Sequence, residues 1–181
     1  MPSSRYDVIP KVLDLVVSQK PKSILDVGAG FGKWGFLFRE YLEVWQGNLY
    51  PKDWKIQIDA IEIFRQYTDL PWYKEIYNHI TVADIYEYMK ISEKDNSIDY
   101  YNLIMFGDVI EHLTKPQGKE ILYACKNWIV VTPAYRSPQG EGFGNIHETH
   151  KSFWNTEDFD NYEVIKDRYI VAWRFDKGKM L

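Results

Sequence analysis

The stretch Ile24-Leu25-Asp26-Val27-Gly28-Ala29-Gly30-Phe31-Gly32 decides the fold of this chain. It begins as a short apolar run, which is typical of a buried parallel strand, and ends in three glycines at alternate positions before a helical pattern. Glycine lacks a Cβ and adopts positive φ at little cost, so Gly28, Gly30 and Gly32 suit a sharp turn that a ligand approaches closely. The segment therefore predicts a turn that binds a nucleotide-like ligand.

The glycine spacing narrows the kind of ligand. A dinucleotide fingerprint, GxGxxG, places a glycine at position 33, where this chain has Lys33. The pattern is DxGxGxG instead, which favours a smaller and less anionic ligand than a pyrophosphate. Residues 26–32 resemble the first motif of the Rossmann-like S-adenosylmethionine-dependent methyltransferases, and the resemblance extends over about residues 24–154. It implies S-adenosylmethionine as the cofactor.

The chain is read as one α/β domain over residues 1–181, because apolar spacing predicts alternating helices and strands without a linker or repeat. Helices are expected at 6–18, 33–44, 86–90 and 116–125, and strands at 24–27, 56–62, 80–83, 101–106 and 128–131, with Pro133 ending the last. Residues 162–166 and 169–175 flank a turn at Asp167-Arg168 and predict a hairpin. The resemblance implies a three-layer Rossmann-like sandwich, with a mostly parallel seven-stranded sheet and an antiparallel C-terminal hairpin.

Composition disfavours several classes of function. Basic residues number 22 and acidic residues 26, a net charge of −4, and the basic residues are scattered, which disfavours nucleic acid as a partner. No apolar stretch approaches the roughly 20 residues that span a bilayer, and residues 1–6 lack the apolar core of a secretory signal, so no membrane association and a cytoplasmic location are expected. The only cysteine, Cys125, excludes an internal disulfide and is expected on a buried helix face.

Acidic residues follow the second and third strands, at the sheet edge where open α/β sheets bind ligands. Glu62 closes the second strand, where a carboxylate can accept both hydroxyls of a ribose, and Ile63 can cover an adenine face. Asp59 is a weaker rival because it lies within the strand. The resemblance implies that Asp84 accepts from the adenine amino group while Ile85 packs on the ring; a helix N-cap is the alternative for Asp84.

After the fourth strand, residues 106–113 read FGDVIEHL and resemble the DVxEH motif of small-molecule methyltransferases. Carbonyl groups of Phe106 and Gly107, next to Asp108, are expected to accept from the methionyl ammonium, with Asp26 helping directly or through water. His112 is a candidate base because histidine titrates near neutral pH. A role in orienting the loop is the alternative for His112.

Residues 132–154 form a glycine-punctuated segment at the ligand edge, which predicts a lid that handles the substrate. Tyr135, His147 and His150 are the candidates for contacting a methyl acceptor. A structural role for both histidines is an open alternative. No metal is expected, because the sequence HETH at 147–150 lacks the HExxH spacing of helical zinc sites and has no cysteine nearby.

The sequence thus predicts an S-adenosylmethionine-dependent methyltransferase with a small-molecule acceptor. A non-catalytic S-adenosylmethionine-binding module is the alternative, and a nicotinamide-dependent oxidoreductase is opposed by Lys33 and by the terminal hairpin. The connection at 46–55 is longer than a usual αβ loop and rich in aromatic residues. Its rings, like those of the lid, suit either a planar or sugar-like acceptor or the face of a homodimer.

Overall fold

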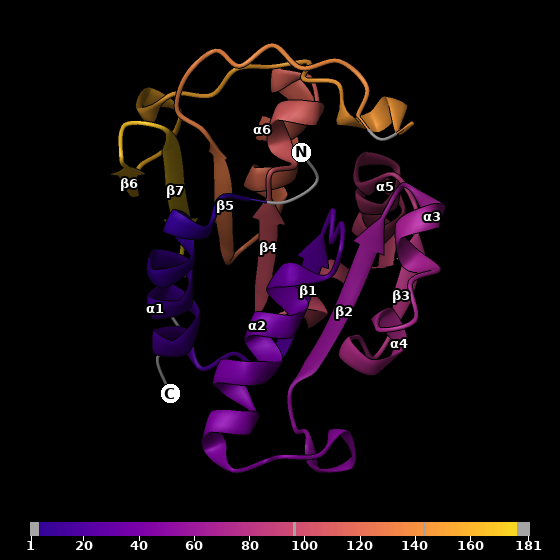
Figure 1. The fold of residues 1–181 in the computed structure, drawn as a ribbon. Helices are drawn as coiled ribbons and strands as arrows, with labels where there is room; N and C mark the ends of the chain where they lie inside the picture. The colour runs from indigo at the N-terminus through magenta and orange to yellow at the C-terminus, as the bar shows by residue number, and fades with distance from the viewer. Residues whose placement is uncertain (1–3, 96, 143, 177–181) are drawn as a thin grey trace.

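A single seven-stranded sheet forms the centre of the computed structural model, which describes residues 4–95, 97–142 and 144–176 (Figure 1). The strands are β1 (Ser23–Val27), β2 (Gln57–Glu62), β3 (Ile80–Val82), β4 (Leu103–Gly107), β5 (Trp128–Pro133), β6 (Tyr162–Ile165) and β7 (Tyr169–Arg174). Their order is β3-β2-β1-β4-β5-β7-β6, and all pairs are parallel except β5 with β7 and β7 with β6. The mostly parallel sheet with an antiparallel C-terminal hairpin is confirmed.

Helices cover both faces of the sheet and complete three layers. The α-helices are α1 (Ile9–Gln19), α2 (Lys33–Leu42), α3 (Arg65–Thr68), α4 (Tyr73–Ile76), α5 (Ile85–Asp95) and α6 (Lys115–Ala124). Short 3₁₀ turns are η1 (Tyr6–Val8), η2 (Val44–Gln46), η3 (Pro51–Asp53), η4 (Ser97–Tyr100), η5 (Ile110–His112), η6 (Ile146–Glu148) and η7 (Thr156–Asp158). Buried side chains of α1, α2 and α4 pack in one apolar cluster, and those of α5 and α6 pack in a second. No helix in the described part of the chain is long and apolar enough to cross a membrane.

Several element ends differ from the predicted ones for local reasons. Helix α2 ends at Leu42, two residues before its predicted end. Helix α5 begins one residue before the predicted range of 86–90 and ends five residues after it. Strand β5 continues through Pro133, which pairs with Tyr169 at the end of the ladder, where a missing N–H is tolerated. The hairpin turn is centred on Lys166-Asp167, both at positive φ, one residue before its predicted place. Helices α3 and α4 were not predicted, because four residues show no periodicity.

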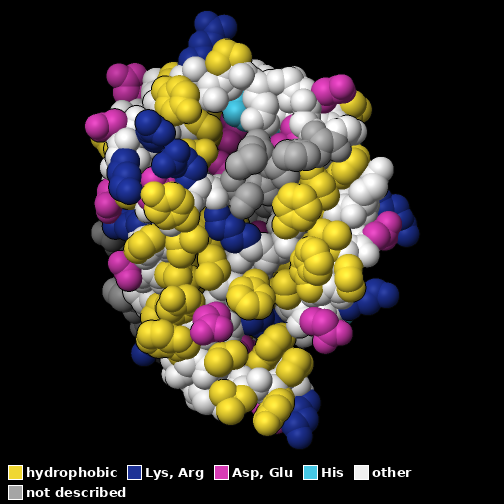
Figure 2. Space-filling model, viewed as in Figure 1, with side chains coloured by type: hydrophobic (Ala, Val, Ile, Leu, Met, Phe, Trp, Pro, Cys, Tyr) yellow, Lys and Arg dark blue, Asp and Glu magenta, His cyan; other side chains and the backbone are white. Residues whose placement is uncertain are grey.

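The aromatic insertion at 46–55 lies at the amino edge of the sheet, away from the carboxyl ends of the strands. The Glu43 carboxylate holds it by accepting from Asn48 Nδ2 (2.8 Å) and from the amides of Lys55 and Ile56 (2.7 and 2.6 Å). Large apolar side chains gather on the surface of the face that Figure 2 turns to the viewer. The insertion contributes no residue to the ligand cleft described below, so its predicted part in acceptor binding is not supported, whereas the homodimer stays a prediction.

The turn after β1 joins the sheet to α2 and α4 through a buried carboxylate. Gly28 and Gly30 have φ of 62° and 56°, the left-handed region that glycine adopts most readily. Asp26, fully buried, accepts hydrogen bonds through Oδ2 from Gly35 N (3.1 Å) and from the Tyr77 hydroxyl (2.6 Å). Burial raises the pKa of Asp26 to about 7, although these two hydrogen bonds oppose the shift.

This pKa makes stability depend on pH through Asp26. In the unfolded chain the carboxyl group titrates near pH 4, so between about pH 4 and 7 the unfolded state releases its proton first. The contribution of Asp26 to the free energy of unfolding therefore falls as pH rises through this window and is constant above the folded pKa. Asp26→Asn keeps an acceptor but removes the titration, so its free energy of unfolding should fall less between pH 5 and 8, by on the order of 1 kcal/mol or more. Urea unfolding at both pH values measures the difference, and parallel pH dependences for the two proteins would contradict it.

Candidate functional site

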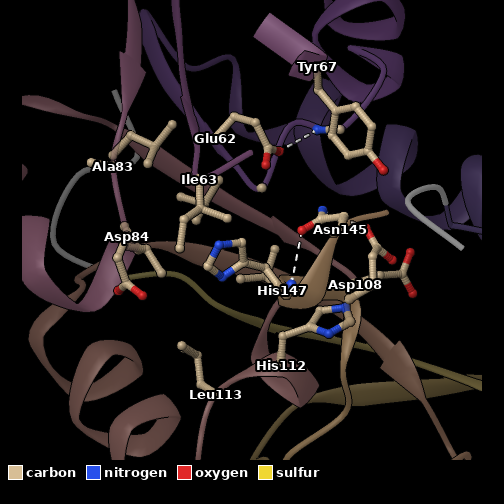
Figure 3. Close-up of a pocket in the computed structure, with 18 of the residues that line it drawn as sticks. Glu62, Ile63, Tyr67, Ala83, Asp84, Asp108, His112, Leu113, Asn145 and His147 are labelled. Atoms are coloured by element: carbon tan, nitrogen blue, oxygen red, sulfur yellow. Dashed lines mark hydrogen bonds between the residues drawn. The ribbon is translucent and has the colours of Figure 1, made fainter. Parts of the chain in front are cut away.

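A cleft of about 710 Å³, its open mouth included, lies at the carboxyl ends of β1, β2, β3 and β4 (Figure 3). Predicted site residues that line it are Gly28, Gly30, Glu62, Ile63, Asp84, Ile85, Gly107, Asp108, His112 and His147. The parallel strands and their crossovers bring these residues, distant in sequence, to one edge of the sheet.

Other predicted site residues lie outside this cleft. Asp26 and Phe106 are fully buried beneath it, and Gly32 begins α2 on a separate apolar groove. Tyr135 is half exposed, and His150 lies behind His112 with a ring-to-ring distance of 4.9 Å. None of these five residues therefore lines the cleft.

Glu62 connects the glycine turn to the end of β2. Its Oε2 accepts from Gly30 N (2.9 Å) and its Oε1 from Phe64 N (2.8 Å). A carboxylate oxygen accepts more than one hydrogen bond, so both oxygens keep capacity for a ligand. Burial raises the pKa of Glu62, and the two backbone N–H groups oppose that rise. Asp59, its rival in the sequence, is instead held by Gln57, His79 and Tyr101 within the sheet.

Asp84 lies just after β3, and its position is compatible with both predicted roles, helix capping and contact with a ligand. Its Oδ1 accepts from the amides of Tyr86 (2.7 Å) and Glu87 (3.4 Å), so it caps the start of α5. The same residue lines the cleft next to Ala83 and Ile85. Capping fixes the side chain at the sheet edge, and its position there allows contact with a ligand.

Two acids and a histidine follow β4. Asp108 adopts a positive φ of 56°, and burial raises its pKa to about 6, while the Lys33 charge opposes that shift. Glu111 is fully buried and accepts from the Thr132 hydroxyl (3.1 Å); burial, and next the negative charge of Asp108, hold its pKa well above the ordinary value. Burial lowers the pKa of His112 to about 4, so its imidazole is neutral at pH 7 and a weaker base than the sequence indicated.

The lid is anchored on the turn that contains Glu111. The amides of Lys151 and Ser152 donate to the Glu111 carbonyl (2.8 and 3.0 Å), and Trp154 Nε1 donates to the Ile110 carbonyl (3.1 Å). Trp154 is buried, so the contact also has an apolar base. In Figure 1 the lid, drawn in orange, passes above the carboxyl ends of the strands. This anchorage sets His147 and His150 beside the residues that follow β4.

The sequence did not single out four further residues that line the cleft: Tyr67, Asn145, Glu148 and Lys151. Tyr67 comes from the short helix α3, which has no sequence signature, and in Figure 3 its ring projects across from Asn145. Asn145 begins η6 and accepts from His147 N (2.9 Å). For Asn145, the one signal in the sequence was an asparagine directly before a short polar turn, because asparagine side chains often cap such turns.

No protein-family model and no curated protein sequence matches the chain. Solved structures do match its fold. The PH0226 protein from Pyrococcus horikoshii OT3 is 14% identical, with a TM-score of 0.60 over 94% of this chain and 88% of that one. A SAM-dependent methyltransferase from Archaeoglobus fulgidus is 19% identical, with a TM-score of 0.55 over 83% of this chain and 63% of that one.

An O-methyltransferase family protein from Burkholderia thailandensis is 7% identical, with a TM-score of 0.56 over 95% of this chain and 57% of that one. An rRNA methylase from Escherichia coli matches as well, at 11% identity and a TM-score of 0.54, over 93% of this chain and 64% of that one. The chain thus spans less than two thirds of three of these four proteins. At such identities the likeness shows the fold, and the chain has the Rossmann-like fold found in S-adenosylmethionine-dependent methyltransferases.

Proposed function

We propose that the chain is an S-adenosylmethionine-dependent methyltransferase that acts on a small molecule. The observation that carries the proposal is the buried Glu62 carboxylate at the end of β2, which is joined to the glycine turn through Gly30 N and lines the cleft. A carboxylate in this position can accept both hydroxyls of a ribose. The fold supports the proposal because proteins of this architecture use the same sheet edge for ligands.

The cleft can hold the three parts of the cofactor in order along the sheet edge. Ribose would lie on Glu62, and adenine between Ile63 and Ile85 with its amino group toward Asp84. Residue 28 lacks room for a side chain, because a Cβ there would lie 2.4 Å from Val109 Cγ2. The methionyl part would extend past this glycine toward Gly107 and Asp108, where carbonyl and carboxylate oxygens accept from an ammonium group.

Methyl transfer is a displacement at the sulfonium of the cofactor. When bound, S-adenosylmethionine would supply the methyl group: its bond to sulfur would break as the acceptor atom bonds to the methyl carbon, and the electron pair would stay on sulfur. A proton on the acceptor leaves to a base or to water. The protein contributes mainly by aligning the two reactants. Because burial lowers the pKa of His112 to about 4, its imidazole is neutral at pH 7 and is a weak general base.

Charge in the cleft favours a small acceptor over a nucleic acid. The lining residues include the four acids Glu62, Asp84, Asp108 and Glu148 and one lysine, Lys151. Phosphate-binding surfaces have the opposite balance, because lysine and arginine neutralise the backbone. An rRNA methylase shares this fold, so the fold alone does not select the acceptor.

The start of α2 opposes binding of a nicotinamide dinucleotide in this cleft. A pyrophosphate would lie at that helix N-terminus, but Gly32 and Lys33 face the separate apolar groove. Lys33 Nζ also donates to the Ser4 carbonyl, which occupies the side chain. The residues at this helix N-terminus are therefore turned away from the cleft.

A comparison of ligands tests the cofactor. Saturating S-adenosylhomocysteine should raise the melting temperature by several degrees, whereas NADH at the same concentration should leave it unchanged. Incubation with methyl-labelled S-adenosylmethionine and pooled metabolite acceptors, in parallel with RNA, should then transfer label to a small molecule only. Stabilisation by NADH alone would refute the cofactor, labelled RNA would refute the acceptor class, and tight cofactor binding without transfer to any acceptor would favour the non-catalytic module.

Replacing Glu62 tests its ribose role. Glu62→Ala removes two charge-assisted hydrogen bonds to the ligand, each contributing about 1.5 to 3 kcal/mol, so the affinity for S-adenosylhomocysteine should fall at least tenfold in calorimetry. Glu87→Ala is the matched control, because Glu87 is an exposed acid at the same sheet edge outside the cleft. Circular dichroism checks that both variants fold. Equal affinities for folded Glu62→Ala and the wild type would remove Glu62 from this role.

A further inference from the structure

Three potential metal ligands meet between the end of β4 and the lid. One ligand atom from each of Glu111, His112 and His150 lies within 4.8 Å of the other two. Glu111 and His112 come from η5, and His150 comes from the lid that docks on that turn. Two ligands at about 2.0 to 2.2 Å from a tetrahedral ion are about 3.3 to 3.6 Å apart, so the three ligand atoms would need to approach one another by up to about 1.5 Å to share an ion.

Hydrogen bonds outside the cluster prepare both imidazoles for an ion. His112 Nδ1 lies 3.3 Å from the Thr149 carbonyl, and His150 Nδ1 bonds the Ser137 carbonyl. A carbonyl only accepts, so each Nδ1 carries the hydrogen and each Nε2 keeps its lone pair. Histidine ligands of metals are oriented in this way, with the second ring nitrogen donating to a backbone carbonyl.

A second acid, Asp108, lies next to the cluster. Asp108 Oδ2 is buried and accepts no hydrogen bond from the residues that the structure describes. Asp108 and His112 line the same cleft, and Figure 3 shows both on the wall below Asn145. The Glu111 side chain and the Oδ2 atom of Asp108 are thus both withdrawn from water near the cluster, where a divalent cation would add to the positive charge that Lys33 already places beside Asp108.

We propose that Glu111, His112 and His150 bind a divalent first-row transition-metal ion at the edge of the cleft, with Asp108 beside it. Two imidazoles and a carboxylate suit Zn²⁺, Fe²⁺, Co²⁺ or Mn²⁺ better than Mg²⁺ or Ca²⁺, which prefer oxygen ligands. Three protein ligands leave coordination positions open on the ion. Because His112 lines the cleft, these open positions would face the cleft. Resting on the proposed methyltransferase function, the ion would hold an oxygen of the acceptor and lower the pKa of its hydroxyl group.

The expectation of no metal came from the order of residues along the chain. The prediction considered His147 and His150 as a pair within HETH at 147–150. In the structure the two side chains separate, because His147 lines the cleft and His150 packs against His112. The ligand set combines one residue of this segment with two from the turn after β4. Only the docking of the lid brings them together.

Metal titration of the purified, tag-free chain tests the site. After dialysis against a chelator, Co²⁺ should bind with a stoichiometry of about one in calorimetry and give visible absorption bands typical of nitrogen and oxygen ligands. His150→Ala should weaken Co²⁺ binding at least tenfold and remove the bands. Glu111→Gln should do the same if it folds, and His150→Ala keeps the test decisive if it does not. His147→Ala is the matched control from the same lid and should bind Co²⁺ like the wild type.

Binding of S-adenosylhomocysteine, measured on the same samples, separates this proposal from the proposed function. Wild-type protein that binds S-adenosylhomocysteine but no Co²⁺ would overturn the metal site and leave the cofactor assignment standing. Protein that binds Co²⁺ through His150 but not S-adenosylhomocysteine would do the reverse. Equal Co²⁺ binding by the wild type and by folded His150→Ala would also overturn the site, as would loss of the spectrum in His147→Ala.

Discussion

The close packing of the glycine turn against the residues after β4 is the constraint on which the ligand edge depends. Gly28 has a φ of 62°, and a Cβ on it would overlap Val109, so no other residue fits without displacing its neighbour. This contact brings the first turn of the sheet against the segment that carries Asp108. The cleft lies between these two segments. The adjacent parallel strands β1 and β4 are followed there by helices on opposite faces of the sheet, α2 after β1 and α6 after β4.

Two buried carboxylates keep this edge in shape from either side. Asp26 ties the glycine turn to α2 and α4, and Glu62 ties it to β2 through Gly30 N. Burial raises the pKa of both, because the charged form loses water there. Hydrogen bonds oppose the rise, from the Tyr77 hydroxyl and a backbone N–H for Asp26 and from backbone N–H groups for Glu62. The cost of these buried acids fits a site that uses one of them, Glu62, to recognise a ligand.

Much of the fold followed from short-range patterns. The strands at β1, β2, β4 and β5 and the C-terminal hairpin are visible as apolar runs with clear ends, and the acids at 62, 84 and 108 follow such runs. Placement in the cleft could be expected for these acids because parallel strands share one carboxyl edge. Tyr67 and Asn145 could not be expected there, because a four-residue helix and an irregular lid have no period that fixes which side chain faces inward.

The sequence by itself determined the seven strands and the helices α1, α2, α5 and α6 in their order along the chain, the glycine turn and the set of acids at the sheet edge, since all of these depend on neighbouring residues and on alternation along the chain. Tertiary structure decided which histidines face the cleft, the withdrawal of Asp26 into the core and the meeting of His150 with Glu111 and His112. The physical reason is that the lid is held by hydrogen bonds to the carbonyls of Ile110 and Glu111, about 40 residues earlier. Backbone carbonyls are the same in every residue, so no pattern of side chains in the sequence marks this contact.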